Sequence, residues 1–275
     1  MHDRKDAGNN RPAGPVASNF TGVDAYSPRE MAARVEAAGV IKAGLPFDKL
    51  AMLGLLAGAF IGFGAALFTV VMTGNGLGFG PGRLLGGVAF SLGLILVIVG
   101  GAELFTGNAL IVMAWADRKV TTIGLLRNWS ISYVANALGA AALALIVWRS
   151  GILGPGGMSE TAIKIAEAKM ALGWEEAFWR GVLCNTLVCL AVWLCFAARS
   201  VTDKIVAIIL PIAAFVALGF EHSIANFYLI PIGMLLGAEG GLSGLVGNLV
   251  PVTLGNIAGG AGGVALVYWV NYGRR

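Results

Sequence analysis

The feature that most constrains this chain is a pair of matching interruptions in its long apolar runs. The first reads Gly101-Ala102-Glu103-Leu104-Phe105-Thr106-Gly107-Asn108, and the second reads Gly219-Phe220-Glu221-His222-Ser223-Ile224-Ala225-Asn226. Each copy has a carboxylate two residues after a glycine and an asparagine five residues after the carboxylate, and 118 residues separate the copies. Matching interruptions in two halves of a membrane protein indicate a substrate path near the middle of the bilayer.

The composition places most of the surface of this chain in lipid. Of 275 residues, 57% are hydrophobic and 12% are charged, whereas a soluble domain carries about 25% charged residues. Several apolar runs approach or exceed the ~20 residues that a helix needs to span a bilayer. The 41 glycines suit close packing of helices in lipid. The expected fold class is therefore an all-α membrane protein, with the lipid bilayer as its partner.

Other classes of site find little support in the sequence. Cys184, Cys189 and Cys195 lie in one predicted helix without a Cys-x-x-Cys spacing, so we expect buried free thiols and no metal. The lysines and arginines form no stripe that would bind nucleic acid. We expect no cofactor, because no phosphate loop, nucleotide fold or His-Glu-x-x-His pattern is present.

Six membrane elements are predicted, of which the second and the fifth are broken. Their apolar runs cover residues 50–71, 84–99 with a resumption at 109–115, 129–148, 181–198, 205–218 with a resumption at 227–236, and 245–270. With the N-terminus in the cytoplasm, 14 lysines and arginines fall inside and 5 outside. This excess favours cytoplasmic N- and C-termini. Five elements would put the termini on opposite sides.

A short helix is predicted ahead of these elements. Ser27, Pro28 and Glu30 form a capping box with proline at the first helical position. The apolar side of the helix carries Met31, Val35, Val40 and Ile41, and we expect it to lie at the membrane surface. The predicted organisation is a disordered tail over 1–26, this amphipathic helix over 27–44, a six-helix transmembrane domain over 45–272 with repeat halves at about 45–150 and 172–272, and a C-terminal tail over 273–275.

A second match supports the repeat. Asn128 and Asn136 are eight residues apart with Gly139 three residues further on, and the same spacing returns at Asn248, Asn256 and Gly259, 120 residues later. A unit of three membrane elements that is repeated must insert in opposite senses. The expected result is an inverted repeat around a pseudo-two-fold axis in the membrane plane.

The interruptions contain ionisable and amide side chains at membrane depth. We expect Glu103, Asn108, Glu221 and Asn226 to bond the backbone groups that leave the helix, because an unpaired group there costs several kcal/mol. Direct contact with the substrate is the alternative role for these four residues. His222 is different, because an ionisable residue within the membrane is costly and marks function.

The electrostatics of His222 point to a small anion. A bare anion enters an apolar constriction at a much higher cost than its protonated acid. Since imidazole exchanges protons near neutrality, a weak monovalent acid anion could take a proton from His222, cross as a neutral species and return it. Alternatively, a cationic His222 could hold the anion by charge. Thr106 lies in the first interruption and is a candidate hydroxyl partner.

Over about residues 28–271 the chain resembles the formate/nitrite transporter family of anion channels. The resemblance rests on six motifs: Phe90-Ser91-Leu92-Gly93-Leu94-Ile95-Leu96, Glu103-Leu104-Phe105-Thr106-Gly107-Asn108, Arg127-Asn128-Trp129, Cys184-Asn185-Thr186-Leu187-Val188-Cys189-Leu190-Ala191-Val192-Trp193, Gly219-Phe220-Glu221-His222-Ser223-Ile224-Ala225-Asn226 and Asn248-Leu249-Val250-Pro251-Val252-Thr253-Leu254-Gly255-Asn256. The resemblance implies an aquaporin-like fold and a homopentamer with one pore in each protomer.

The resemblance also implies roles for single residues. The matching positions are Phe90 and Phe215 for a periplasm-side constriction, Leu94, Leu104 and Phe105 for a cytoplasm-side constriction, Thr106, Asn185 and His222 for the polar site between them, and Lys169 for a vestibule lysine that attracts anions. Residues 100–108 match the family's mobile loop. The helix from Ser27 matches an N-terminal helix tied to gating in some members.

The expected function is a channel or proton-coupled transporter for small monovalent anions in a bacterial inner membrane, with formate first. A nitrite or hydrosulfide channel is the alternative, because the family's branches share these motifs. A neutral-solute channel of the aquaporin type would carry paired Asn-Pro-Ala segments, which this chain lacks. An intramembrane enzyme would need a nucleophile–base pair or a metal cluster, and the sequence offers one membrane histidine, so no enzyme is expected.

Overall fold

The computed structural model describes residues 24–273, and in this range it is built of helices without strands. Five of its helices are long and apolar enough to cross a membrane: α2 (Phe47–Met72), α3 (Phe79–Gly100), α5 (Thr122–Arg149), α7 (Trp174–Ala197) and Gly241–Gly273, which comprises α10 (Gly241–Ile257), η3 (Ala258–Leu266) and η4 (Trp269–Gly273). The predicted all-α membrane class is confirmed. The tail predicted over 1–26 falls mainly on residues 1–23, outside the described residues, as do residues 274–275 of the C-terminal tail.

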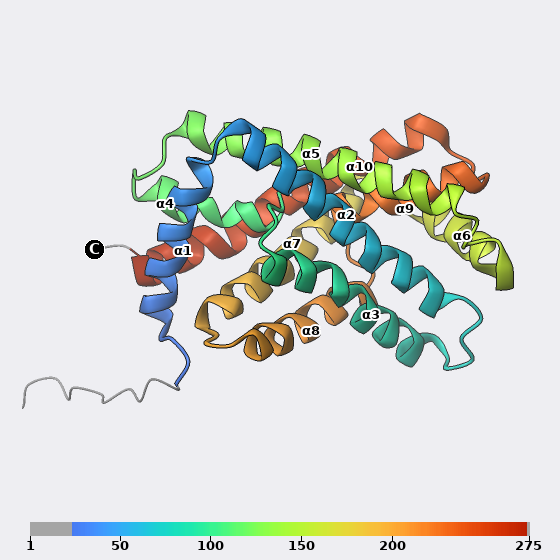
Figure 1. Cartoon of the computed structure of the whole chain (residues 1–275), viewed down its shortest axis with the longest axis horizontal. Helices are drawn as coiled ribbons and strands as arrows, with labels where there is room; N and C mark the ends of the chain where they lie inside the picture. The colour runs from blue at the N-terminus through green and yellow to red at the C-terminus, as the bar shows by residue number, and fades with distance from the viewer. Residues whose placement is uncertain (1–23, 274–275) are drawn as a thin grey trace, which may run out of the picture.

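The remaining helices are shorter and surround the two interruptions. They are α1 (Pro28–Ala43), η1 (Gly107–Ile111), α4 (Val112–Ala116), η2 (Pro155–Gly157), α6 (Met158–Met170), α8 (Val201–Ala217) and α9 (Ser223–Leu236). Figure 1 shows α1 and α6 at opposite ends of the molecule. There α1 packs on η1 and α4, and α6 packs on α9. Each interruption is therefore covered by one short helix.

The start of α1 is as predicted, but its buried face is narrower. The Ser27 hydroxyl accepts from the Glu30 backbone N–H, and the Ser27 N–H donates to the Glu30 carboxylate, so the capping box is confirmed. Met31 and Val35 are buried, whereas Val40 and Ile41 are exposed. A helix advances 100° per residue, so Val40 and Ile41 turn away from the face that Met31 and Val35 share.

α6 is a helix to which the sequence analysis assigned no element. Its charged residues, such as Glu160 and Lys164, leave no apolar run long enough to be recognised as a membrane span. Ala162 and Ala166 are buried, and a Cβ built on Gly233 of α9 would lie 2.3 Å from the Ala166 Cβ. Small side chains therefore bring α6 and α9 into close contact.

Two glycines allow the longest helix pairs to touch through their backbones. A Cβ at Gly139 of α5 would lie 2.0 Å from the Leu55 carbonyl oxygen of α2. A Cβ at Gly259 would lie 2.1 Å from the Val182 carbonyl oxygen of α7. Real Cβ atoms do not approach so closely, so both positions require glycine, as expected for helices that pack in lipid. The two contacts occupy matching places in the two halves of the chain.

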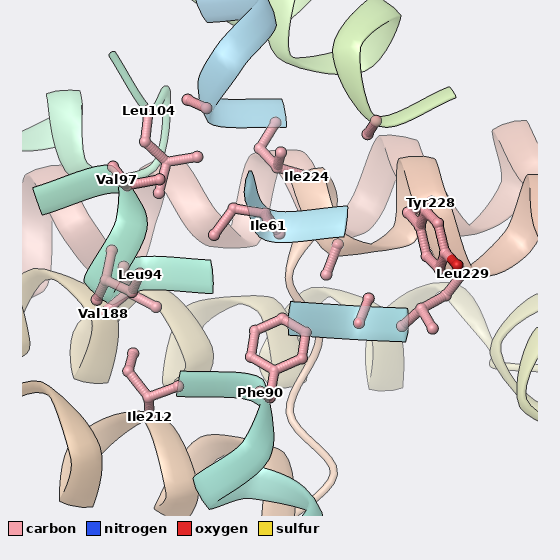
Figure 2. Close-up of a cluster of buried hydrophobic side chains, with 14 of the residues drawn as sticks. Ile61, Phe90, Leu94, Val97, Leu104, Val188, Ile212, Ile224, Tyr228 and Leu229 are labelled. Atoms are coloured by element: carbon pink, nitrogen blue, oxygen red, sulfur yellow. The ribbon is translucent and has the colours of Figure 1, made fainter. Parts of the chain in front are cut away.

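The largest apolar cluster lies at the centre, where α2, α3, α7, α8 and α9 meet. Figure 2 shows Phe90, Leu94 and Val97 along α3, with Leu104 beside Val97. All four side chains are buried. Ala102, Leu104 and Phe105, which follow α3, belong to this cluster, and Phe220, which follows α8, packs against it.

Candidate functional site

Both interruptions begin at a glycine in the left-handed region. α3 ends at Gly101, with φ of +80°, and the chain after α8 turns at Gly219, with φ of +75°. The next backbone N–H folds back in each case, since the Ala102 N–H donates to the Val97 carbonyl at 2.9 Å and the Phe220 N–H to the Phe215 carbonyl at 3.0 Å. A left-handed glycine of this kind ends a helix at low cost. It directs the following residues across the core.

The Asn136 side chain holds the first interruption. Its Oδ1 accepts from the Phe105 N–H at 2.8 Å. Its Nδ2 donates to the Gly54 carbonyl at 2.8 Å and to the Glu103 carbonyl at 2.9 Å. One buried amide therefore pairs three backbone groups that would otherwise be unsatisfied in an apolar core.

The Asn256 side chain does the same for the second interruption. Its Oδ1 accepts from the Ser223 N–H at 2.9 Å, and its Nδ2 donates to the Gly181 carbonyl at 2.8 Å and the Glu221 carbonyl at 2.9 Å. Asn136 and Asn256 were predicted as repeated positions, without a role. Each of these two asparagines therefore pairs two backbone groups of an interruption and one of a neighbouring helix.

The Glu103 carboxylate bonds side chains instead of backbone groups. It accepts from Lys42 Nζ at 2.6 Å and from Asn108 Nδ2 at 2.9 Å. Asn108 Nδ2 also donates to Asn128 Oδ1 at 2.9 Å, and Asn128 Nδ2 donates to the Lys42 carbonyl at 2.9 Å. These four residues, Lys42, Glu103, Asn108 and Asn128, form a closed network that we call the Lys42 network.

The Glu221 carboxylate is surrounded in the same way. It accepts from Lys169 Nζ at 2.9 Å and from Asn226 Nδ2 at 2.7 Å. Asn226 Nδ2 donates to Asn248 Oδ1 at 2.7 Å, and Asn248 Nδ2 donates to the Lys169 carbonyl at 2.9 Å. We call these four residues the Lys169 network. The predicted support residues Glu103, Asn108, Glu221 and Asn226 thus tie α1 and α6 to the two interruptions.

Lys169 was a predicted site residue, whereas its counterpart Lys42 was not. A spacing of 127 residues relates Lys42 to Lys169, and the same spacing relates Gly54 to Gly181. The interruptions are related by 118 residues, because the connected helices and loops before them differ in length between the halves. A search at the spacing of 127 would have aligned Ile41-Lys42-Ala43 with Ala168-Lys169-Met170.

Thr106 and His222 meet at the centre of the molecule. Thr106 Oγ1 lies 2.9 Å from His222 Nε2, and both residues are fully or almost fully buried. His222 Nδ1 accepts a hydrogen bond from the Ala225 backbone N–H at 3.1 Å. A nitrogen that accepts carries no proton, so in this arrangement the imidazole is neutral and its Nε2–H donates to the Thr106 hydroxyl.

The Asn185 side chain acts on the position of Thr106. Asn185 Nδ2 donates to the Thr106 carbonyl at 3.2 Å and to the Asn256 carbonyl at 2.6 Å. The Cys189 thiol, which is a free cysteine like Cys184 and Cys195, lies 3.3 Å from the same Thr106 carbonyl. Both hydrogen bonds that the Asn185 amide nitrogen donates therefore go to backbone carbonyls.

A cavity of about 170 Å³ reaches His222 from the side of α6, and we call it the Lys169 cavity. Phe90 and Phe215 line it, with their rings in an edge-to-face contact at 5.6 Å. The Phe215 ring lies 6.1 Å from the imidazole of His222. Both aromatic residues therefore lie along the cavity that reaches the imidazole, and Lys169 and Glu221 line the same cavity.

A second cavity, of about 400 Å³, lies beneath α1, and we call it the Lys42 cavity. Leu94, Val97 and Leu104 line it together with Lys42 and Glu103. Val97 was not among the predicted constriction residues, although it follows Leu94 by three residues on the same face of α3.

The predicted constriction residue Phe105 lines neither of these two cavities. Its ring packs edge-to-face on Tyr133 at 4.9 Å and on Trp129 at 6.2 Å. Phe105 therefore contributes to the wall behind the interruption through these rings.

Comparisons with known proteins agree on one family. The family model for the formate/nitrite transporter matches residues 29–270. The chain is 41% identical over 265 residues to a probable formate transporter of Methanothermobacter thermautotrophicus. The alignment covers 90% of this chain and 97% of that protein. It is 40% identical over 271 residues to the formate channel FocA of Escherichia coli, and this alignment covers 90% of this chain and 95% of FocA.

Solved structures give the same answer for the fold. A pentameric formate channel with formate bound superposes with a TM-score of 0.76 at 40% identity, covering 83% of this chain and 98% of that one. An ion channel of the same family superposes with a TM-score of 0.78 at 30% identity, covering 89% and 98%. The chain belongs to the formate/nitrite transporter family, a family of membrane channels and transporters rather than of enzymes.

Proposed function

We propose that this chain is a channel for small monovalent weak-acid anions, with formate as the first substrate. The observation that carries the proposal is the buried Thr106–His222 pair at the end of the Lys169 cavity, enclosed by apolar side chains. Formate channels at 40% identity support the choice of formate. Nitrite or hydrosulfide is the alternative substrate.

The proposed architecture has six crossing elements, with the second made of α3 and η1–α4 and the fifth of α8 and α9. Contacts between equivalent residues support a pseudo-two-fold axis. Ser91 Oγ donates to the Ile209 carbonyl at 3.4 Å, and the hydroxyls of Tyr133 and Thr253 lie 2.8 Å apart. The members of each pair are separated by 118 and 120 residues, and a residue meets its own equivalent only on a two-fold axis.

The repeat unit that we propose is longer than the predicted halves of 45–150 and 172–272. The Lys42 and Lys169 networks share four equivalent hydrogen bonds, so α1 corresponds to α6 and each repeat begins with its short helix. The transmembrane domain then includes the helix predicted at 27–44. In the proposed assembly five copies associate through their exposed apolar faces, with both termini in the cytoplasm of a bacterial cell and one path through each protomer.

The proposed path runs from the Lys169 cavity, past Phe90 and Phe215, to His222, and on past Leu94 and Leu104 to the Lys42 cavity. Lys169 and Lys42 attract the anion electrostatically from the two sides. The apolar constrictions favour the protonated acid over the bare anion, because desolvation of a charge costs far more than desolvation of a small neutral acid. Asn185 positions Thr106 in the path.

His222 meets the substrate through Nε2 in this proposal. Its Nδ1 is occupied by the Ala225 N–H, so the neutral ring presents the Nε2–H donor to an oxygen of the substrate in the place of Thr106 Oγ1. Proton transfer from an imidazolium requires that the Ala225 hydrogen bond break first, since Nδ1 must then carry a proton. The two roles of His222 therefore differ in their dependence on pH.

The test is the uptake of formate, nitrite and hydrosulfide by proteoliposomes between pH 5 and pH 8. We expect formate uptake by the wild-type protein, and a loss of at least about tenfold in His222→Ala, which corresponds to one lost hydrogen bond to a charged group. His222→Asn keeps an N–H donor without a titrating proton. Donation by the neutral ring predicts partial recovery in His222→Asn, whereas proton transfer predicts none.

Matched threonine variants separate the site from the fold. Thr106→Val removes the hydroxyl beside Nε2 and should slow uptake, whereas Thr69→Val removes a buried hydroxyl that bonds its own helix at Ala65 and should not. A finding that proteoliposomes with the wild-type protein take up none of the three anions would contradict the proposed function. Undiminished uptake by His222→Ala at every pH would contradict only the proposed role of His222, and the proposed function would stand.

A further inference from the structure

Two arginines converge at the mouth of the Lys169 cavity. Arg83 of α3 and Arg180 of α7 both line it together with Lys169. A Cβ built on Gly219 would lie 3.0 Å from Arg83 Nη2 and 3.6 Å from Arg180 Nη1. Both guanidinium groups therefore reach the same turn after α8, where the absence of a side chain leaves space between them.

The charges around this point are not balanced within residues 24–273. Arg180 donates to the Gly219 carbonyl at 3.1 Å and pairs with Glu176 at 2.5 Å. Lys169 pairs with Glu221. Arg83 forms no ion pair with any described carboxylate, and its guanidinium carbon lies 5.1 Å from the Phe79 ring centre.

The uncompensated charge of Arg83 lies in a partly buried position beside the Arg180 guanidinium. Arg83 is half-buried beside a second guanidinium, so it is less hydrated than a free surface arginine. Two like charges that converge repel each other, and an anion between them offsets this repulsion. A guanidinium presents parallel N–H donors at the spacing of the two oxygens of a carboxylate, and a one-atom anion cannot accept both in this parallel, linear geometry.

We propose that Arg83 and Arg180 form a binding site for planar two-oxygen anions, of the carboxylate class, on the α6 side of Phe90 and Phe215. This inference rests on the proposed function, because the bound anion is the one that then enters the path. The site concentrates the substrate at the mouth. It also favours carboxylate and nitrite ions over anions such as hydrosulfide or chloride.

The experiment compares Arg83→Gln and Arg83→Lys with the wild-type protein in right-side-out membrane vesicles. We measure the formate concentration that gives half-maximal uptake, and the same quantity for hydrosulfide. Arg149→Gln is the matched control, because its guanidinium also lies 5.1 Å from an aromatic ring, that of Trp148, and Arg149 lines neither cavity.

Arg83→Gln should raise the half-maximal concentration for formate about three- to tenfold at low salt, and less at high salt, because the charge is screened. The value for hydrosulfide should change less. Arg83→Lys keeps the charge without the planar fork, so it should recover the hydrosulfide value more fully than the formate value. Arg149→Gln should leave both values unchanged.

Direct binding of ¹³C-formate to the purified protein in detergent, followed by saturation-transfer NMR, gives a readout that does not depend on transport. Wild-type protein should show a bound fraction that Arg83→Gln lowers and Arg149→Gln does not. Equal half-maximal concentrations and equal binding in wild type and Arg83→Gln would overturn the site. Formate binding that depends on Arg83 without formate uptake would instead overturn the proposed function and leave the site standing.

Discussion

The segments after α3 and α8 share one scaffold of hydrogen bonds, yet they present different side chains to the core. Asn136 and Asn256 bond the backbone of the two segments in the same way. At the position where the second segment has His222, the first has Leu104, 118 residues earlier. The duplicated residues hold the backbone, and the unduplicated histidine carries the proposed chemistry.

The lysine networks also differ in their exposure. The Lys42 side chain is 32% exposed and the Lys169 side chain is 15% exposed, although both pair with a buried glutamate. A more exposed ion pair is weaker because water screens it. The two ends of the proposed path are therefore alike in chemistry and unlike in electrostatic strength.

The largest expected effect comes from removing the asparagine side chains that bond the backbone of the two interruptions. Asn136→Ala leaves three buried backbone groups without partners, and Asn256→Ala leaves three equivalent ones. Each unpaired buried group costs about 1–3 kcal/mol, so the free energy of unfolding of each variant should fall by about 3 kcal/mol or more. Thermal unfolding of the purified protein in detergent measures the loss. Equal losses would show that the scaffold is equivalent in both halves.

Asn271→Ala is the control for these variants, because its exposed amide bonds its own helix at the Val267 carbonyl. It should unfold like the wild-type protein. A loss in Asn256→Ala several times greater than in Asn136→Ala would contradict an equivalent scaffold.

An intermediate effect concerns the two ion pairs. Double-mutant cycles with Lys169→Met and Glu221→Gln should give a coupling of about 3 kcal/mol, since one partner removed from a buried pair leaves an uncompensated charge. Cycles with Lys42→Met and Glu103→Gln should give about 1 kcal/mol, because Lys42 is hydrated. Chemical denaturation measures both. A coupling at Lys42 as large as at Lys169 would show that exposure does not distinguish the two ends.

The smallest expected effect concerns the capping box at the start of α1. Hydrogen bonds from Ser27 lower the pKa of Glu30. A carboxylate with a lowered pKa stabilises the folded state above its ordinary pKa, and this contribution is lost as the pH falls through the lowered value.

Glu30→Gln should therefore reduce the melting temperature slightly near neutral pH. The difference from the wild-type protein should vanish in acid, where the wild-type carboxylate is protonated. Melting curves between pH 3 and pH 7 measure this dependence. A difference that persists unchanged at pH 3 would rule out the capping interaction as its cause.

Several parts of the site were within reach of the sequence, because they repeat. The spacing of 118 residues marked both interruptions, and the spacing of 120 residues marked Asn136 and Asn256. The role of these asparagines was not predictable, since it depends on which backbone carbonyls approach their amides from other helices. Lys42 was missed because its spacing of 127 residues differs from the other two.

Phe105 illustrates what periodicity cannot decide, whereas the place of Val97 on the Leu94 face of α3 follows from helical spacing. Val97 lies before the first interruption and Phe105 lies within it, and both are buried. Phe105 packs on Tyr133 and Trp129, whereas Val97 lines the Lys42 cavity. The direction of the Phe105 side chain is set by the turn at Gly101 and by the helices around it, so the local sequence carries no sign of it.

The sequence by itself determined that this chain is a helical membrane protein with two matching polar interruptions and one histidine at membrane depth. Hydropathy and composition suffice for this, because a lipid environment demands long apolar helices and tolerates polar residues only for a reason. The tertiary structure decided that the candidate partner Thr106 lies 2.9 Å from His222, and it alone showed that Arg83 and Arg180 converge at Gly219. Contacts between residues far apart in the chain depend on how the helices pack, which no local pattern encodes.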